Sequence, residues 1–307
     1  MSLLTLFNAM PGAIAQGLIW GIMAIGVYIT YKVLDVADLS VDGTMCTGGA
    51  VCIMMLMSGA PMWLALIVAV IVGMIAGLAT GILHTLMGIP AILAGILTQL
   101  GLYSVNLKIM GKANVPINNQ KYDLMVSLLY VKNVPFYKNT ILIVAICILI
   151  LVAILYWFFG TELGCALRAT GCNPNMSRAQ GINTKVNIVL GLMISNGIVA
   201  FASALLSQYQ GFCDINMGRG AIVIGLAAVI IGEVVFGKLF HNFALKLVAV
   251  ALGGVIYYAV LQVVIWLGFD TDLLKLLSAI VVAIFLAIPY VKKEYFPKKK
   301  QTAKEDK

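Results

Sequence analysis

Residues 139–160 read NTILIVAICILILVAILYWFFG and decide the fold class, because this stretch is apolar almost from end to end and carries no charge. A helix of about 20 such residues is long enough to span the hydrocarbon core of a bilayer. Similar blocks recur along the 307-residue chain, which is 62% hydrophobic and only 10% charged. A soluble domain carries about 25% charged residues. The sequence therefore predicts an all-α, polytopic transmembrane helical bundle and not several soluble domains.

We expect about nine spans, within a range of about eight to ten, from the length and the flanks of the apolar blocks. The blocks cover residues 12–34, 43–58, 62–84, 89–108, 139–160, 187–209, 220–237, 246–267 and 273–290. The second block is short for a full crossing. Residues 1–291 are accordingly predicted to form a transmembrane domain, interrupted by a polar loop at 161–186, and residues 292–307 to form a basic tail.

The placement of the basic residues predicts the orientation. The net charge is +8, and seven of the 20 basic residues follow Val291. The loop 161–186 is also basic, with Arg168, Arg178 and Lys185, and four spans separate it from the tail. Cytoplasmic flanks carry an excess of Lys and Arg, so we expect both segments in the cytoplasm and the N-terminus outside. The segment 109–138 then lies outside despite its four lysines, against the trend. The pattern suits contact with a lipid bilayer and gives no reason to expect nucleic acid.

A short internal echo predicts two interrupted helices. Asp38–Gly43 reads DLSVDG and Asp214–Gly220 reads DINMGRG, and each lies between apolar blocks. An odd number of predicted crossings separates them, so the copies would face opposite ways, as in an inverted repeat. Charges within a membrane tend to face cavities or partners. We therefore expect a translocation pathway lined by Asp38, Ser40, Asp42, Gly43, Asp214 and Asn216.

A plainer interpretation of these acids stays open. An Asp suits a helix start because it accepts hydrogen bonds from the free amides of the first turn. Asp42 would then cap the helix that follows it at the membrane surface. Lys32 would lie close enough to pair with the acidic cluster.

The loop 161–186 is rich in small and polar residues and is long enough for one or two short helices. Gly171 and Asn173 can supply a turn, and Pro174 suits the first position of a helix. Such a segment would lie on the membrane surface, where it could dock into a groove of another protein. It could equally be an ordinary solvated loop.

The sequence predicts neither a catalytic residue nor a metal site. Its six cysteines show no CxxC spacing, and its two histidines have no second ligand nearby. Gly232–Leu239 matches GxxxxGK, but Leu239 stands where a phosphate-binding loop needs Ser or Thr for magnesium. We therefore expect no cofactor on this chain. If ATP is used, ATP and Mg²⁺ should be held by a partner subunit.

Within the loop, the run Gly164–Ile182 resembles the cytoplasmic signature of permease subunits of bacterial ABC importers of the branched-chain amino acid and ribose type. That pattern has a Gly, an Arg-Ala pair, Gly-x-Asn, a short helix and Gly-Ile. The matching residues are Gly164, Arg168, Ala169, Gly171, Asn173, Gly181 and Ile182. Asp38–Gly43, Asp214–Gly220 and Gly225–Gly232 are similar to the tryptophan and tyrosine transport subgroup.

The resemblance implies a permease subunit in a bacterial cell membrane that is not itself an enzyme. It implies a dimer with a second permease copy, cytoplasmic ATP-binding subunits, and an extracytoplasmic solute-binding lipoprotein. The solute would be an amino acid, with an aromatic one suggested by the subgroup. The loop would couple to the ATPase through Gly164, Arg168, Ala169, Gly171, Asn173, Arg178 and Gly181.

Three alternatives remain at this stage. A secondary transporter driven by an ion gradient would show the same inverted repeat and buried acids. An integral-membrane enzyme acting on lipid could use the cluster Asp35, Asp38 and Asp42. A passive channel is the third, although no filter-like repeat is present.

Overall fold

The computed structural model describes residues 3–118, 121, 122, 124–131, 139–268, 276, 278–285 and 287. Within them, six helices are long and apolar enough to cross a membrane. The first is α1 (Leu3–Tyr28), which continues as the π-helix η1 (Ile29–Val33). The others are α3 (Met62–Thr85), α4 (Ala91–Met110), α5 (Thr140–Gly160), α8 (Thr184–Gln210) and α10 (Phe243–Trp266). The prediction of a polytopic helical bundle is confirmed.

The predicted count of nine full spans is not confirmed. Blocks 43–58 and 220–237 form α2 (Val41–Met57) and α9 (Ala221–Phe236), which are shorter apolar helices. The block 273–290 is described only at residues 276, 278–285 and 287, and the basic tail 292–307 falls wholly outside the described residues. The two short helices follow the two sequences that form the internal echo.

The polar loop forms two more helices, α6 (Glu162–Cys172) and α7 (Pro174–Ala179), with Pro174 in the first turn as predicted. A short 3₁₀ turn, η2, covers Leu128–Val131. Strands β1 (Asn114–Pro116) and β2 (Phe212–Asp214) pair antiparallel, with Asn114 opposite Asp214. Sequence reasoning did not predict this small ribbon.

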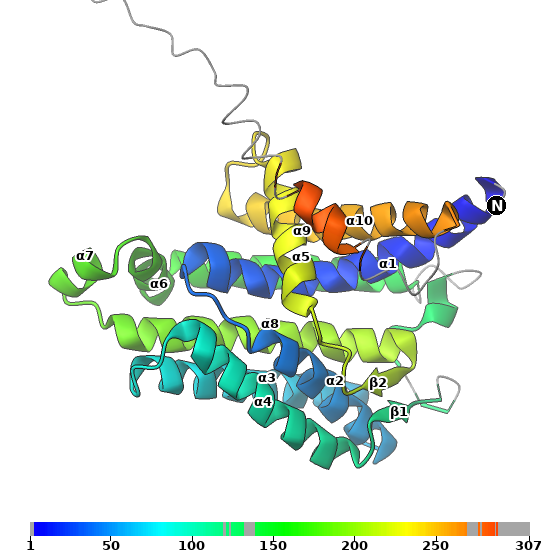
Figure 1. Ribbon diagram of the computed structural model, residues 1–307, viewed down its shortest axis with the longest axis horizontal. Helices are drawn as coiled ribbons and strands as arrows, with labels where there is room; N and C mark the ends of the chain where they lie inside the picture. The colour runs from blue at the N-terminus through cyan, green and yellow to red at the C-terminus, as the bar shows by residue number, and fades with distance from the viewer. Residues whose placement is uncertain are drawn as a thin grey trace, which may run out of the picture.

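The long helices lie along one axis of the molecule. In Figure 1, α1, α8 and α10 run nearly parallel, with α6 and α7 at one end of the bundle and the N-terminus at the other. The β1–β2 ribbon lies toward the N-terminal end. The predicted coupling loop and the N-terminus therefore lie at opposite ends, as a single crossing by α1 requires.

Glycine residues lie where two helices approach each other most closely. On α3, Gly73, Gly77 and Gly81 recur every four residues, and a Cβ on Gly77 would collide with the Leu192 carbonyl of α8. Such stripes of small residues let two backbones approach in a membrane, where dispersion contacts and not hydrophobic burial favour association. As a result α8 is buried along most of its length, whereas α4 and α5 are largely exposed on the outside of the bundle.

Candidate functional site

The chain breaks after η1 and turns inward before α2 begins. Asp35, in this turn, adopts a left-handed backbone conformation with φ of 54°. Asp38 is then only 2% exposed, and its Oδ1 accepts hydrogen bonds from the Ser40 backbone N (2.9 Å) and Ser40 Oγ (2.6 Å). A buried carboxylate is costly unless it is hydrogen-bonded, so this turn supplies part of the compensation.

Asn196 of α8 supplies a further hydrogen bond to the buried Asp38 carboxylate. Its Nδ2 donates to Asp38 Oδ2 at 2.8 Å, and its Oδ1 accepts from Thr44 Oγ1 at 2.7 Å and from Ser40 Oγ at 3.2 Å. Asn196 lies near the midpoint of α8, and its carbonyl packs against Gly73 near the midpoint of α3. The last part of the predicted break, at Asp38 and Ser40, is therefore buried at mid-bundle, whereas Asp35 near its beginning is exposed.

Sequence reasoning missed Asn196. The signal was a Ser-Asn pair, Ser195–Asn196, inside an apolar block. Polar residues at that position of a spanning helix are a known indication of interhelical hydrogen bonds.

Asp42 caps a helix, but not the one predicted. The N-cap of α2 is Ser40, and Asp42 lies in the first turn of that helix. Its carboxylate instead accepts hydrogen bonds from Gly220 N and Ile222 N, both at 3.0 Å, at the start of α9. Gly220 takes a φ of +84° at this point, which a Gly adopts at little cost. The two echo sequences therefore meet, and one supplies the cap of the other's helix.

The predicted pairing of Lys32 with the acidic cluster is wrong. Lys32 Nζ lies 3.0 Å from Glu233 Oε2 near the end of α9. The pair is half-exposed and contributes little to stability by itself. The position of this ion pair shows that the C-terminal end of α9 lies beside the end of η1.

From their common start, α2 and α9 run to opposite ends of the bundle. Contacts of α2 advance along α8 from Thr44–Asn196 to Cys52–Gln208, toward the C-terminus of α8. Contacts of α9 advance along α1 from the Gly225–Val27 contact to Glu233–Lys32, toward η1. Two half-length helices that begin near mid-bundle and diverge are the arrangement that the echo predicted.

The six predicted pathway residues do not form one cluster. Asp38 and Ser40 are buried and bonded to each other. Asp214 belongs to the ribbon, where its Oδ2 accepts from Asn114 Nδ2 at 3.3 Å and its Oδ1 accepts from Asn216 N at 2.8 Å. Asp214 and Asn216 therefore shape the turn that leads to α9 and are more exposed than the buried pair.

The loop 161–186 lies at the end of the bundle where η1 and α9 also end. Thr161 Oγ1 accepts from Gly164 N (3.4 Å) at the start of α6, and the Asn173 side chain accepts from Asn175 N and Met176 N (both 3.1 Å) at the start of α7. Gly171 allows contact with the Val33 carbonyl, because a Cβ there would collide with it. These contacts hold α6 against the end of α1.

Further contacts fix the loop to the spanning helices. Asn187 Nδ2 of α8 donates to Thr170 Oγ1 at 3.0 Å. The guanidinium of Arg168 lies 5.4 Å from the ring centroid of Phe243 in α10, and Arg178 Nε donates to Thr184 Oγ1 at 3.0 Å. Both arginines are nevertheless exposed. These contacts fix the segment to the end of the bundle, and both arginines keep exposed surface.

The remaining predicted residues of this loop lie within α6 or in the turn after α7. Gly164 lies against the Phe158 carbonyl, and Ala169 is half-buried in α6. Gly181 takes a φ of +78° in the turn between α7 and α8.

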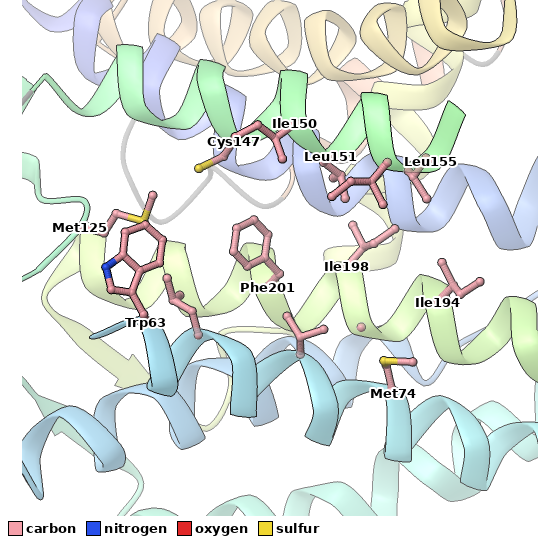
Figure 2. Close-up of a pocket in the computed structure, with 14 residues that line it drawn as sticks. Trp63, Met74, Met125, Cys147, Ile150, Leu151, Leu155, Ile194, Ile198 and Phe201 are labelled. Atoms are coloured by element: carbon pink, nitrogen blue, oxygen red, sulfur yellow. The ribbon is translucent and has the colours of Figure 1, made fainter. Parts of the chain in front are cut away.

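Several cavities lie between the described helices, and two of them differ in the polarity of their lining. The apolar one, of about 400 Å³, lies between α3, α5 and α8 (Figure 2). Figure 2 shows Phe201 and Ile198 of α8 facing Ile150 and Leu151 of α5, with Trp63 of α3 at one end. This cavity offers almost no polar group to orient a solute. The other cavity, of about 250 Å³, is more polar than the first and is lined in part by Asp42 and Gly43.

No group of three His, Cys, Asp or Glu side chains within the described residues is arranged to hold a metal ion. All six cysteines are free. The geometry offers interrupted helices around buried polar groups, together with a surface segment at one end of the bundle.

Comparison with known proteins gives a consistent result. The family model described as "Branched-chain amino acid transport system / permease component" matches residues 10–287. A tyrosine transport system permease protein of Clostridioides difficile (strain R20291) is 39% identical over 272 residues, covering 89% of this chain and 88% of that protein. An uncharacterised protein of Rickettsia prowazekii (strain Madrid E) is 35% identical over 289 residues, covering 94% of this chain and 99% of that protein.

A more distant relative is a fructose import permease protein of Bifidobacterium longum (strain NCC 2705). It is 26% identical over 257 residues, which are 80% of this chain and 68% of that protein. No solved structure matches this one significantly.

Proposed function

Since this chain belongs to the family of branched-chain amino acid transport system permease components, we propose that it is the membrane-spanning subunit of an ATP-driven importer of an amino acid. Tyrosine is the first solute to test, because a relative that is 39% identical is a tyrosine transport permease. The family is one of multi-pass transport permeases, so the alternative of a lipid-acting enzyme is wrong. The transporter alternatives differ in what supplies the energy.

The observation that carries the proposal is the α6–α7 segment. It projects from one end of the bundle, is held by side-chain hydrogen bonds to α8, and exposes Arg168, Arg178 and Met176, the last with 53% of its surface accessible. An ordinary solvated loop needs no such fixation. A rigid, cationic segment with an exposed apolar side chain suits docking into an ATP-binding subunit, where desolvated Arg and Met side chains are favoured contacts.

The same segment lies where motion could be transmitted. Gly171 of α6 contacts Val33, and η1 leads within a few residues to the buried pair Asp38 and Ser40. A displacement of α6 by the ATPase would therefore act on the break between α1 and α2. In this proposal ATP and Mg²⁺ belong to the partner, and ATP hydrolysis drives alternating access around the break.

The remaining parts of the proposal concern assembly. The α6–α7 end faces the cytoplasm of a bacterial cell, together with the tail, and the N-terminal end faces outward. A solute-binding lipoprotein delivers the amino acid there. A second permease copy completes a dimer, and the ATP-binding subunits lie beneath it.

The test is a pull-down of the tagged chain from its native membrane in mild detergent, with identification of the subunits that co-purify. We expect a stoichiometric ATP-binding subunit with the wild type and its loss in Arg168→Glu and Arg178→Glu, because each reversal places an anion on the docking face. Lys112→Glu is the matched control. It reverses an exposed charge that follows α4, near the ribbon, and should leave the complex intact.

A second experiment measures tyrosine uptake by cells and identifies the energy source for transport. Uptake that follows the ATP level and survives a protonophore supports the proposal. A chain that purifies alone, with uptake abolished by the protonophore, would favour the ion-coupled transporter and make the 161–186 segment a connector.

A further inference from the structure

The polar cavity of about 250 Å³ opens between α2, α4 and the turn before α9. It lies beside the mid-bundle junction, because Asp42 and Gly43 form one wall. The opposite wall comes from α4, where polar or aromatic side chains recur at helical spacing. The residues that carry the argument are Asp42, Gln99, Tyr103, Asn106 and Arg219.

Asn106 is the first observation that points to a ligand. It is 1% exposed, and its Nδ2 donates to the Gly43 carbonyl at 3.3 Å. Its Oδ1 has no hydrogen-bond partner within the described residues. Nearly all buried polar atoms in proteins are paired, so this shielded acceptor, in a residue that lines the cavity, indicates a donor that the described residues do not supply.

Arg219 is the second observation. Its side chain is exposed and forms no ion pair or hydrogen bond with the part of the chain that the structure describes. Its depth is fixed by its neighbours, because Gly218 packs on the Asp42 carbonyl and Gly220 N donates to Asp42. A guanidinium near mid-bundle is costly against lipid, so it should face a hydrated space or an anion.

The start of α9 is not available for that anion. Its first amides are already bound by the Asp42 carboxylate. Anion recognition in this cavity therefore falls to Arg219, whose planar fork of donors suits a carboxylate. Tyr103, which is 44% exposed, presents an aromatic face on the same side of α4 as Asn106.

We propose that this cavity binds the solute inside the permease and recognises the zwitterionic end of an amino acid. Arg219 binds the α-carboxylate, and the Asn106 side chain, after turning toward the cavity, accepts a hydrogen bond from the α-ammonium group through Oδ1. The ring of Tyr103 contributes a cation–π contact to the same ammonium group. The inference rests on the proposed function, since it names where and how the imported amino acid is held.

The test uses the complete transporter in proteoliposomes, with tyrosine-loaded binding protein as the varied component. We expect Arg219→Gln and Asn106→Leu each to lower the maximal tyrosine uptake by about tenfold or more, because each removes one hydrogen bond to a charged group. The concentration of loaded binding protein at half-maximal uptake should not change, because docking happens before the solute reaches the cavity. Arg219→Lys, which keeps the charge, should restore part of the rate.

Two controls separate this effect from misfolding. Each variant must retain wild-type amounts of co-purifying ATP-binding subunit. Lys108→Gln removes an exposed cation near the end of α4, away from the cavity lining, and should transport normally.

Wild-type maximal rates in both Arg219→Gln and Asn106→Leu, in a transporter that imports tyrosine, would overturn this inference and leave the proposed function standing. A wild-type transporter that imports no amino acid would overturn both.

Discussion

The mid-bundle junction and the α6–α7 segment handle polar groups in opposite ways. At the junction, Asp38, Ser40 and Asn196 are buried and bond to one another. In α6–α7, side-chain hydrogen bonds fix the helices, while Arg168 and Arg178 keep exposed surface. Burial makes each junction group dependent on its partner, whereas exposure leaves the arginines free to meet another protein. Substitutions at the junction should therefore lower the stability of the fold, and substitutions in the α6–α7 segment should weaken its binding to a partner subunit.

The largest expected effect on stability is at Asn196. Asn196→Leu keeps the approximate size of the side chain but leaves Asp38 Oδ2 without its amide donor. We expect a loss of roughly 2–3 kcal/mol in unfolding free energy, because a hydrogen bond to a buried carboxylate is removed. Unfolding in mixed detergent micelles, followed by tryptophan fluorescence, measures it. Asn175→Leu, at an exposed position of α7, is the control and should stay near the wild type.

An intermediate effect is expected where α2 packs on α8. A Cβ on Gly48 would collide with the Ala200 carbonyl, so Gly48→Ala must separate the two helices. Overpacking of this kind costs about 1–3 kcal/mol. Gly101→Ala is a matched control, because Gly101 lies in α4 with no atom near its missing Cβ. Equal stability of the two variants in the same unfolding assay would show that the close approach of α2 and α8 is not required.

The smallest effect on stability is expected at Arg178. Arg178→Gln removes one partly buried hydrogen bond to Thr184 from an exposed side chain and should change the unfolding free energy by no more than about 0.5 kcal/mol. The same variant should weaken retention of the ATP-binding subunit in the pull-down. A large loss of stability together with normal retention would reverse the assignment of roles to the two regions.

Local signals in the sequence were sufficient for several features. The block 139–160 predicted α5, and Pro174 after Asn173 predicted the start of α7. The echo between DLSVDG and DINMGRG predicted two interrupted helices. These features depend on hydropathy, helix propensity and capping within a few residues, and such information is present in the chain itself.

These local signals did not predict which side chains pair with each other in the folded chain. In the plainer interpretation Asp42 caps its own helix, but it instead caps α9, because α9 starts beside it only after the bundle has packed. Lys32 was expected near the acids and instead meets Glu233. In both cases the sequence supplied the right kind of group and the wrong partner.

The sequence by itself determined a membrane-spanning helical bundle, two broken helices, a capped surface segment and the resemblance to a permease family. Only the tertiary structure decided that the two breaks meet near mid-bundle, that Asn196 completes their hydrogen bonds, and that Asn106 and Arg219 share a cavity. The reason is physical. Hydrophobicity and helix capping act over a few residues, whereas a buried hydrogen bond joins atoms more than a hundred residues apart, which only close packing of the helices brings together.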